Sequence, residues 1–156
     1  MSKILIETYI KAPIERCFDL SRSVDLHLMS AAETNELAVA GVTRGLLGPG
    51  DNVTWEARHF GVIQRLSVQI TAYDRPKFFR DSQTKGIFRR FDHDHFFETK
   101  GDGTLIREIF DFDCPMGTLG KLVADYFVAR HLRKFLIKRN EIIKKVAESD
   151  EWRSIL

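Results

Sequence analysis

Residues 51–73 read DNVTWEARHFGVIQRLSVQITAY, and this stretch decides the fold. Apolar and polar side chains alternate on both sides of Phe60-Gly61, which is typical of two β-strands joined by a tight turn. Because alternate residues of a strand point the same way, the first strand places on one face Val53, Trp55, Ala57 and His59. We predict that this face is buried and that the two strands, at 51–60 and 62–73, are antiparallel neighbours.

The same pattern continues in both directions along the chain. Turn signals separate further predicted strands at 34–41, 77–84, 87–98 and 104–113. A strand at 3–11 comes first and is followed by two short helices, one with Pro13 at its first position and ending near Ser21, the other capped by Ser23. After Cys114-Pro115 the helical period lasts to about Ser149. The order predicts an α+β fold, in which a long C-terminal helix crosses the concave face of a strongly curved antiparallel sheet of about seven strands.

The apolar residues of the terminal helix change sides along its length. At about 100° per residue, one cluster is formed by Leu119, Leu122, Val123, Tyr126 and Phe127. A second, about 180° away, is formed by Leu132, Phe135, Leu136, Ile143 and Val146. We predict either a kink or break near Ala129-Arg130-His131 or a first segment buried by a pocket lid or a dimer partner. A helix covered on both sides is the alternative.

Composition narrows the class of protein. With 156 residues, 44% of them apolar, the chain is expected to form one domain over residues 1–149, followed by a C-terminal tail at 150–156. The two cysteines lack the CxxC spacing of zinc or redox motifs. A start without a signal peptide and the absence of a long apolar run favour a cytoplasmic protein. The net charge of +2 argues against a nucleic-acid partner. Residues 116–149 carry eight basic and three acidic residues, so membrane contact remains the weaker alternative.

Polar residues fall on the faces that should be buried. Strand parity places His93 and His95 beside Phe91 and Phe97, and it brings Asp81 inward with Phe79 and Glu108 with Phe112. Each unpartnered polar group in a packed core costs about 1–3 kcal/mol, whereas an apolar cavity needs a few polar anchors. Eight of the 12 Phe residues lie between positions 78 and 112 and would form its wall. The predicted ligand-binding residues are His27, Trp55, His59, Gln64, Phe79, Asp81, Phe91, His93, His95, Phe97 and Glu108.

The His93-x-His95 pair leaves three interpretations open. The two imidazoles could bind a metal with His59, Asp81 or Glu108 as third ligand, anchor a ligand or transfer a proton, or serve as hydrogen-bonded wall residues. The spacing alone does not select a metal, so we expect neither a metal nor another cofactor. Asp81 could raise the pKa of a histidine or form an ion pair with an inward Arg89. No motif of an activated nucleophile occurs, and no catalytic residue is assigned.

The order of elements, with a Gly-rich loop at 41–50, resembles the START-like (Bet v 1-like, SRPBCC) superfamily over nearly the whole chain. The stretches DLH (25–27), AGVTRG (40–45), VTWEARHFG (53–61), FRD (79–81) and FDHDHFFE (91–98) look like a bacterial subgroup without an agreed activity. The resemblance implies a helix-grip fold and a cavity for a hydrophobic small molecule. Superfamily members include lipid carriers, polyketide cyclases and dehydratases, quinone-binding proteins and plant hormone receptors. The loop lacks the lysine often found there in plant members, and no iron–sulfur motif points to the ring-hydroxylase branch.

The leading hypothesis is therefore a protein that binds an apolar or aromatic small molecule, such as a lipid, a quinone or a polyketide-like compound, between sheet and C-terminal helix. The alternative is an enzyme of cyclase, dehydratase or hydrolase type that uses a pocket histidine as general acid or base. A third hypothesis is a membrane-associated carrier that uses the basic helix.

Overall fold

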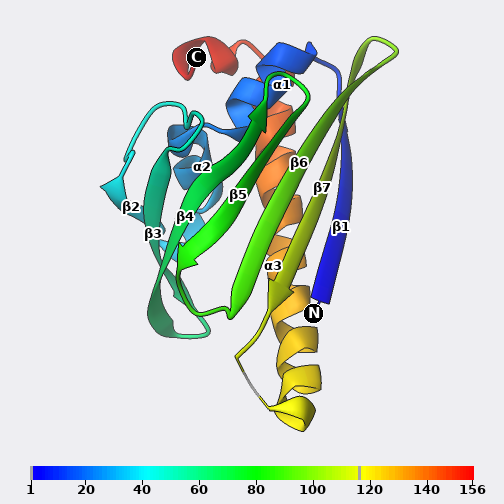
Figure 1. Cartoon of the computed structure of the whole chain (residues 1–156). Helices are drawn as coiled ribbons and strands as arrows, with labels where there is room; N and C mark the ends of the chain where they lie inside the picture. Colours follow the sequence, from blue (N-terminus) through cyan, green and yellow to red (C-terminus); the bar gives the residue numbers. More distant parts are fainter. Residues whose placement is uncertain (1, 116) are drawn as a thin grey trace.

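A computed structural model describes residues 2–115 and 117–156, without the side chains of Thr118 and Leu119. The elements follow the predicted order (Figure 1). The strands are β1 (Ser2–Ile10), β2 (Leu37–Gly41), β3 (Asn52–His59), β4 (Val62–Asp74), β5 (Phe78–Lys85), β6 (Arg90–Lys100) and β7 (Gly103–Asp113). The helices are α1 (Ile14–Ser21), α2 (Val24–Ser30) and α3 (Thr118–Glu148), with short 3-10 turns at Ala32–Thr34 and Glu151–Ser154.

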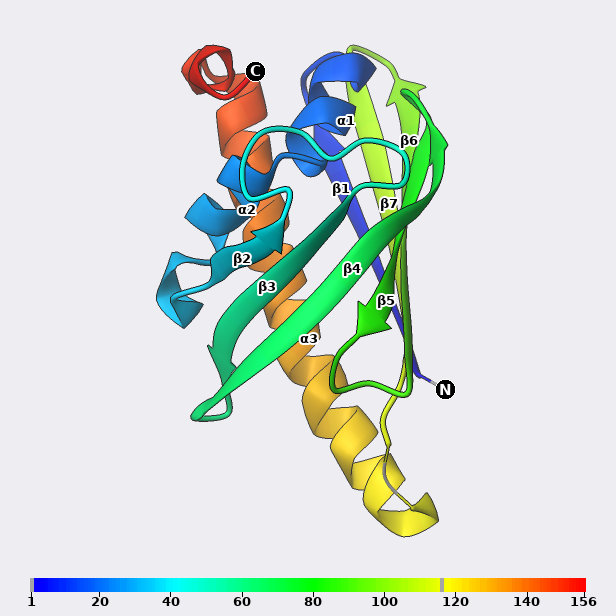
Figure 2. The same ribbon diagram turned by 60° about the vertical axis from the view of Figure 1, so that its left-hand side comes forward.

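All seven strands form one antiparallel sheet in the order β1-β7-β6-β5-β4-β3-β2. Each strand from β2 to β7 pairs with its neighbour in sequence, because short turns allow only antiparallel neighbours. The first strand pairs with the last and forms one edge of the sheet, from Ser2 opposite Phe112 to Ile10 opposite Thr104. The sheet twists strongly, and all three helices lie on one of its faces (Figures 1 and 2).

The core fills the space between the sheet and the helices. Strand parity is confirmed on the central strands, since Val53, Trp55 and Ala57 are buried, as are Phe91 and Phe97. On α1, Phe18 is fully buried and makes edge-on ring contacts to Tyr73, Phe79 and Phe97. Ser23 caps α2 as predicted, because its hydroxyl accepts a hydrogen bond from the backbone N–H of Leu26 at 3.2 Å.

Two predicted strands, at 34–41 and 87–98, begin three residues later than the sequence pattern indicated. The chain at Ala32–Thr34 forms a 3-10 turn, so β2 begins only at Leu37. In the turn before β6, the Gln83 side chain donates to the Phe88 carbonyl at 2.8 Å and accepts from the Phe88 N–H at 3.3 Å. Phe88 is therefore buried and Ile87 exposed, the reverse of the predicted parity. The prediction of an inward Arg89 paired with Asp81 is wrong, because the Arg89 side chain is two-thirds exposed and lies 4.0 Å from Asp113.

The long helix is continuous from Thr118 to Glu148, so the predicted break near Ala129-Arg130-His131 is wrong. No proline interrupts its backbone hydrogen bonds, and its first turns extend beyond the end of the sheet (Figure 2). The apolar side chains there are exposed: Leu122, Val123, Tyr126 and Phe127. Those of the second cluster that face the sheet most directly, Leu136, Ile143 and Val146, are buried. The apolar residues of α3 thus change faces at the point where the helix extends beyond the sheet.

The end of the chain folds back onto the helices. Trp152 in the second 3-10 turn packs against the core, and the guanidinium of Arg16 lies 4.1 Å from the centre of its ring. Among the described residues, none of the helices combines the length and hydropathy needed to cross a bilayer.

Candidate functional site

A cavity of about 160 Å³ lies between the sheet and α3. Its wall is mostly apolar, and Trp55, Ile70 and Phe79 come from three different strands. Most of the predicted ligand-binding residues line this cavity: His27, Trp55, His59, Gln64, Phe79, Asp81, Phe91, His93 and His95. Phe97 and Glu108 do not line it. Phe97 packs against Phe18, and Glu108 lies behind the two histidines of β6.

Cross-strand register brings four ionisable side chains together on the inner face of the sheet. His93 on β6 lies directly opposite Asp81 on β5, and His95 lies directly opposite Glu108 on β7. Because these positions share one strand parity, all four side chains point to the same side. The centres of the two imidazole rings lie 3.9 Å apart with the ring planes tilted by 40°, and His95 stacks on Phe79 at 4.0 Å.

The two histidines lie between two carboxylates. On one side, Asp81 Oδ1 is 2.8 Å from His95 Nε2 and 3.7 Å from His93 Nδ1. On the other side, Glu108 Oε1 is 3.1 Å from both His95 Nδ1 and His93 Nε2. All three of His93, His95 and Glu108 are at most 3% exposed, whereas Asp81 retains partial access to the cavity. These four residues form the His–carboxylate cluster.

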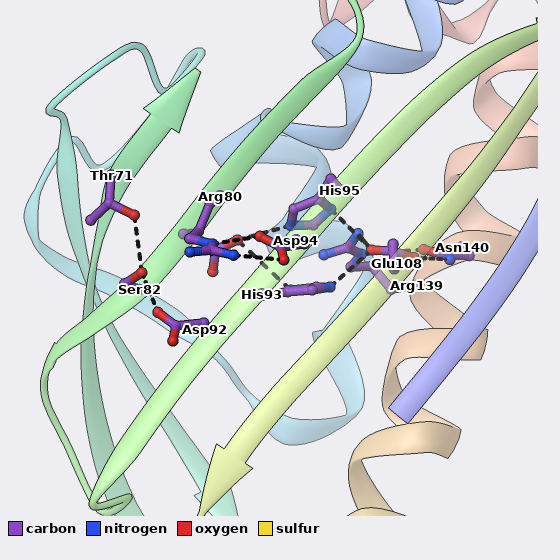
Figure 3. Close-up of polar contacts among 11 residues, drawn as sticks. Thr71, Arg80, Ser82, Asp92, His93, Asp94, His95, Glu108, Arg139 and Asn140 are labelled. Carbon is purple, nitrogen blue, oxygen red and sulfur yellow. Dashed lines mark hydrogen bonds and ion pairs between the residues drawn. The ribbon is translucent and has the colours of Figure 1, made fainter. Parts of the chain in front are cut away.

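Two residues of α3 hold Glu108 in place and were missed from the sequence. Arg139 Nη2 donates to Glu108 Oε1 at 2.5 Å, and Asn140 Nδ2 donates to Glu108 Oε2 (Figure 3). Asn140 also reaches Thr8 Oγ1 on β1 at 3.1 Å. A signal for Arg139 was present, since it falls at i+3 from Leu136 and i−4 from Ile143 on the buried side of the helix.

Burial and the neighbouring charged groups have opposite effects on the pKa values of most groups in the cluster. Burial opposes ionisation of Glu108, but the Arg139 guanidinium holds the pKa of its carboxyl well below the usual range. Burial likewise opposes charge on Asp81, yet His93 and the hydrogen bond to His95 lower its pKa. Burial lowers the pKa of His93, and its neighbour His95 adds to this effect. Burial also works against charge on His95, but the hydrogen bond to Asp81 and the nearby Glu108 carboxylate outweigh it and raise the pKa of that imidazole.

Further histidines line other parts of the cavity wall. His27 stacks on Trp55 at 4.1 Å, and its Nε2 lies 2.6 Å from Oε1 of Glu36, a buried acid that the sequence analysis missed. His59 Nδ1 lies 2.9 Å from Nε2 of His131 on α3. Burial and the neighbouring His59 lower the pKa of His131. His131 lies within the predicted helix break, so it was not predicted to line the cavity.

The outer face of β5 and β6 carries a separate set of polar contacts. Asp94, between the two histidines in sequence, points outward and receives two hydrogen bonds from Arg80, at 2.5 and 2.8 Å. Ser82 donates to Asp92 at 2.6 Å (Figure 3). These contacts lie on the opposite side of the sheet from the cavity, so they support the strands without belonging to the site.

Comparisons with known proteins show what this architecture is similar to. No family model matches the sequence, and no curated protein does. Solved structures do match the fold. The Zhui aromatase/cyclase from Streptomyces sp. R1128 has a TM-score of 0.74 at 12% identity and covers 94% of this chain and 93% of its own. The protein TTHA0849 from Thermus thermophilus has a TM-score of 0.71 at 19% identity and covers 91% of this chain and 97% of its own.

A plant protein extends the likeness. The major latex-like protein 151 from Panax ginseng has a TM-score of 0.65 at 16% identity and covers 95% of this chain and 98% of its own. Identities this low speak for the fold rather than for any one activity. The seven-stranded antiparallel sheet around a long C-terminal helix confirms the predicted architecture, and the chain has the helix-grip fold of the START-like, or Bet v 1-like, proteins.

Proposed function

We propose that this protein binds a small aromatic or apolar molecule that carries one polar group. The single observation behind this proposal is the cavity itself, whose wall is mostly apolar and includes Asp81, His93 and His95 together at one place. An apolar cavity with a few convergent polar groups is the usual form of a small-molecule site. A protein selected for stability alone would fill such a space, because a buried void costs about 24 cal/mol per Å³.

The volume of the cavity suits a small ligand. A cavity of about 150 Å³ holds one benzene ring, and this one is of similar size, at about 160 Å³. One ring therefore fits this volume, and we expect fused rings to fit it less well. The aromatase/cyclase that shares the fold supports an aromatic small molecule as the partner.

The polar group of the ligand would lie at the His–carboxylate cluster. Contacts with Asp81 and Phe79 orient the His95 ring in the absence of a ligand. A hydroxyl at the cavity end of the cluster would donate a hydrogen bond to Asp81, and a hydroxyl or carbonyl oxygen there would accept one from an imidazole N–H. The ring of the ligand would pack against the aromatic wall. Burying an uncompensated polar group costs about 1–3 kcal/mol, so the cluster favours ligands that have an oxygen there.

Calorimetric titration tests this proposal with matched compounds on protein kept in EDTA. We expect 4-methylphenol to bind at one site per chain, toluene to bind more weakly because it lacks the hydroxyl, and 2-naphthol to bind more weakly because of its second ring. Ala57→Leu narrows the cavity and should weaken 4-methylphenol binding at least tenfold. Leu37→Ala is the matched control, since Leu37 is exposed on β2 and should leave binding unchanged. Equal binding of 4-methylphenol by wild type and Ala57→Leu would show that the ligand lies elsewhere.

A second candidate function, acid–base catalysis, is favoured by one contact. Asp81 Oδ1 lies 2.8 Å from His95 Nε2, which is the arrangement that orients a histidine for proton transfer, and both residues line the cavity. A bound ketone would then exchange its α-hydrogens with solvent. NMR of cyclohexanone in deuterium oxide should show exchange that is faster with the protein than with buffer and that His95→Gln abolishes. A rate equal to that of buffer argues against this candidate and leaves ligand binding untouched.

A further inference from the structure

We propose that Asp81, His93 and His95 form a binding site for one divalent transition-metal ion. One ligand atom of each residue lies within 4.8 Å of the other two. Zinc and similar ions bind imidazole nitrogen and carboxylate oxygen at about 2.0–2.2 Å, so ligand atoms around one ion lie about 3–3.5 Å apart. The separations of Asp81 Oδ1 from His95 Nε2 and His93 Nδ1, 2.8 and 3.7 Å, fall on either side of that range. Small side-chain rotations therefore complete the site.

The nitrogens that face away from Asp81 carry the main argument. Histidines that bind metals usually give their other ring N–H to a carboxylate, which fixes the tautomer and the orientation of the ring. Here one oxygen, Glu108 Oε1, lies 3.1 Å from both His93 Nε2 and His95 Nδ1. Neither nitrogen has a well-aligned hydrogen bond among the residues that the structure describes. A metal ion on the Asp81 side would turn both rings, so that their rear N–H groups could point at Glu108.

The charge of the site also suits a cation. Two carboxylates, Asp81 and Glu108, lie against the two imidazoles, and the Arg139 guanidinium is bonded to Glu108. Arg139 and Asn140 thus bind the rear carboxylate and leave Asp81 free to act as a ligand. Two nitrogens and one oxygen form a donor set that accepts zinc, iron, cobalt or nickel.

The position of the site predicts an open coordination sphere. Asp81, His93 and His95 all line the cavity, whereas Glu108 does not, so the remaining coordination positions face the cavity. Three protein ligands with one or more open positions are typical of metal sites that act on ligands rather than of structural sites. This last step rests on the proposed function: the cavity would favour aromatic ligands with an anionic oxygen, such as phenolates or enolates, which can bind the metal directly. Metal binding itself stands without it.

Titration of EDTA-treated protein with Co²⁺ and Zn²⁺ tests the proposal. We expect one equivalent of Co²⁺ per chain, detected by its visible absorption, and displacement by Zn²⁺. His93→Gln, His95→Gln and Asp81→Asn should each weaken binding at least tenfold. Glu108→Gln should weaken it about 10–100-fold, because it leaves the ligands but removes the group that orients them.

A matched variant controls for nonspecific effects. Asp94 lies on the same strand with its side chain on the outer face, so Asp94→Asn should bind Co²⁺ like wild type. If a ligand variant fails to fold, NMR of the wild-type histidine rings decides instead, because Zn²⁺ should shift the signals of His93 and His95 and leave His27 unchanged.

Two outcomes would overturn the metal site: less than one equivalent of Co²⁺ on wild type, or the same affinity in wild type and His93→Gln. The 4-methylphenol titration is carried out in EDTA, so it reports on the cavity alone. Loss of Co²⁺ binding with retained phenol binding would reject the metal and keep the proposed function. Retained Co²⁺ binding without phenol binding would do the reverse.

Discussion

Glu108 is an almost fully buried carboxylate whose stability contribution depends on Arg139. Removing one member of a buried ion pair leaves the other charged and unpaired, which typically costs about 3–5 kcal/mol. We expect Glu108→Gln to lower the free energy of unfolding by about 3 kcal/mol in EDTA, and Arg139→Met to have a similar effect. The double variant should lose less than the sum of the two, because no lone charge remains. Urea unfolding measures all three, and strictly additive losses would mean that the two side chains act independently.

Asp19 on α1 gives stability a dependence on pH away from the cavity. Its carboxylate bonds Arg22 at 2.7 Å and Arg75, in the turn after β4, at 2.7 Å, so it ties the first helix to the sheet. Burial opposes its ionisation, but the two guanidinium groups lower the pKa of Asp19 below its usual value. A carboxyl with a lowered folded-state pKa stabilises the fold above the unfolded pKa of about 3.9, and this contribution is lost as the pH falls through the folded-state pKa.

The variant Asp19→Asn isolates this contribution. At pH 7 it should be less stable than wild type by about 1 kcal/mol, and the difference should shrink steadily below about pH 4. Urea unfolding of both proteins over that pH range is the measurement. Glu7→Gln serves as control, since Glu7 pairs with Arg107 on the exposed face of β1 and β7. A difference that stays constant down to about pH 2.5 would mean that the ionised form of Asp19 does not matter.

At the scale of elements, α3 divides into a buried half and an exposed half. Leu122 and Tyr126 are 72% and 61% exposed, whereas Ile143 is 2% exposed. Replacing both Leu122 and Tyr126 by Gln should change the free energy of unfolding by less than about 0.5 kcal/mol, as for other exposed sites. Ile143→Ala should cost about 2–5 kcal/mol, because it leaves a void against the sheet. Urea unfolding at two protein concentrations checks this, and a loss in the Gln variant that depends on concentration would reveal a second copy covering the segment.

Some elements could be predicted fully from the sequence, and others only in part. Alternation along β3 was enough to identify its buried residues, because Val53, Trp55 and Ala57 meet the core whatever the neighbouring strands do. The start of β6 depended on a side-chain contact from Gln83, which no local pattern records. The sequence showed correctly that the apolar residues of α3 switch from one face to the other. The helical period alone cannot distinguish a broken helix from a continuous helix that extends beyond the sheet.

At the scale of the whole molecule, the cavity could be predicted because the strand pattern places polar side chains where a packed core should be apolar. Parity placed His93, His95, Asp81 and Glu108 on one inner face, and too many polar groups there excluded a fully apolar core. Arg139 could not be assigned in the same way, because its partner lies 31 residues away on a different element. The strand residues of the cluster could thus be predicted from strand parity. Arg139 could not, because its contact with Glu108 depends on how α3 packs on the sheet.

An open cavity should lower the stability of the whole molecule, and filling it should restore part of that stability. Ala57 faces the cavity from β3, whereas Ala12 is equally buried in the packed core beyond its wall. Ala57→Leu places its added carbons in existing space, and at about 24 cal/mol per Å³ of void it should leave stability unchanged or raise it by up to about 1 kcal/mol. Ala12→Leu has no such space and should cost about 1–3 kcal/mol through overpacking. Urea unfolding of the two variants compares them directly, and equal losses would show that the space beside Ala57 is not available. A gain in stability in the variant that no longer binds 4-methylphenol would instead show that the fold keeps this space for a ligand at the expense of its own packing.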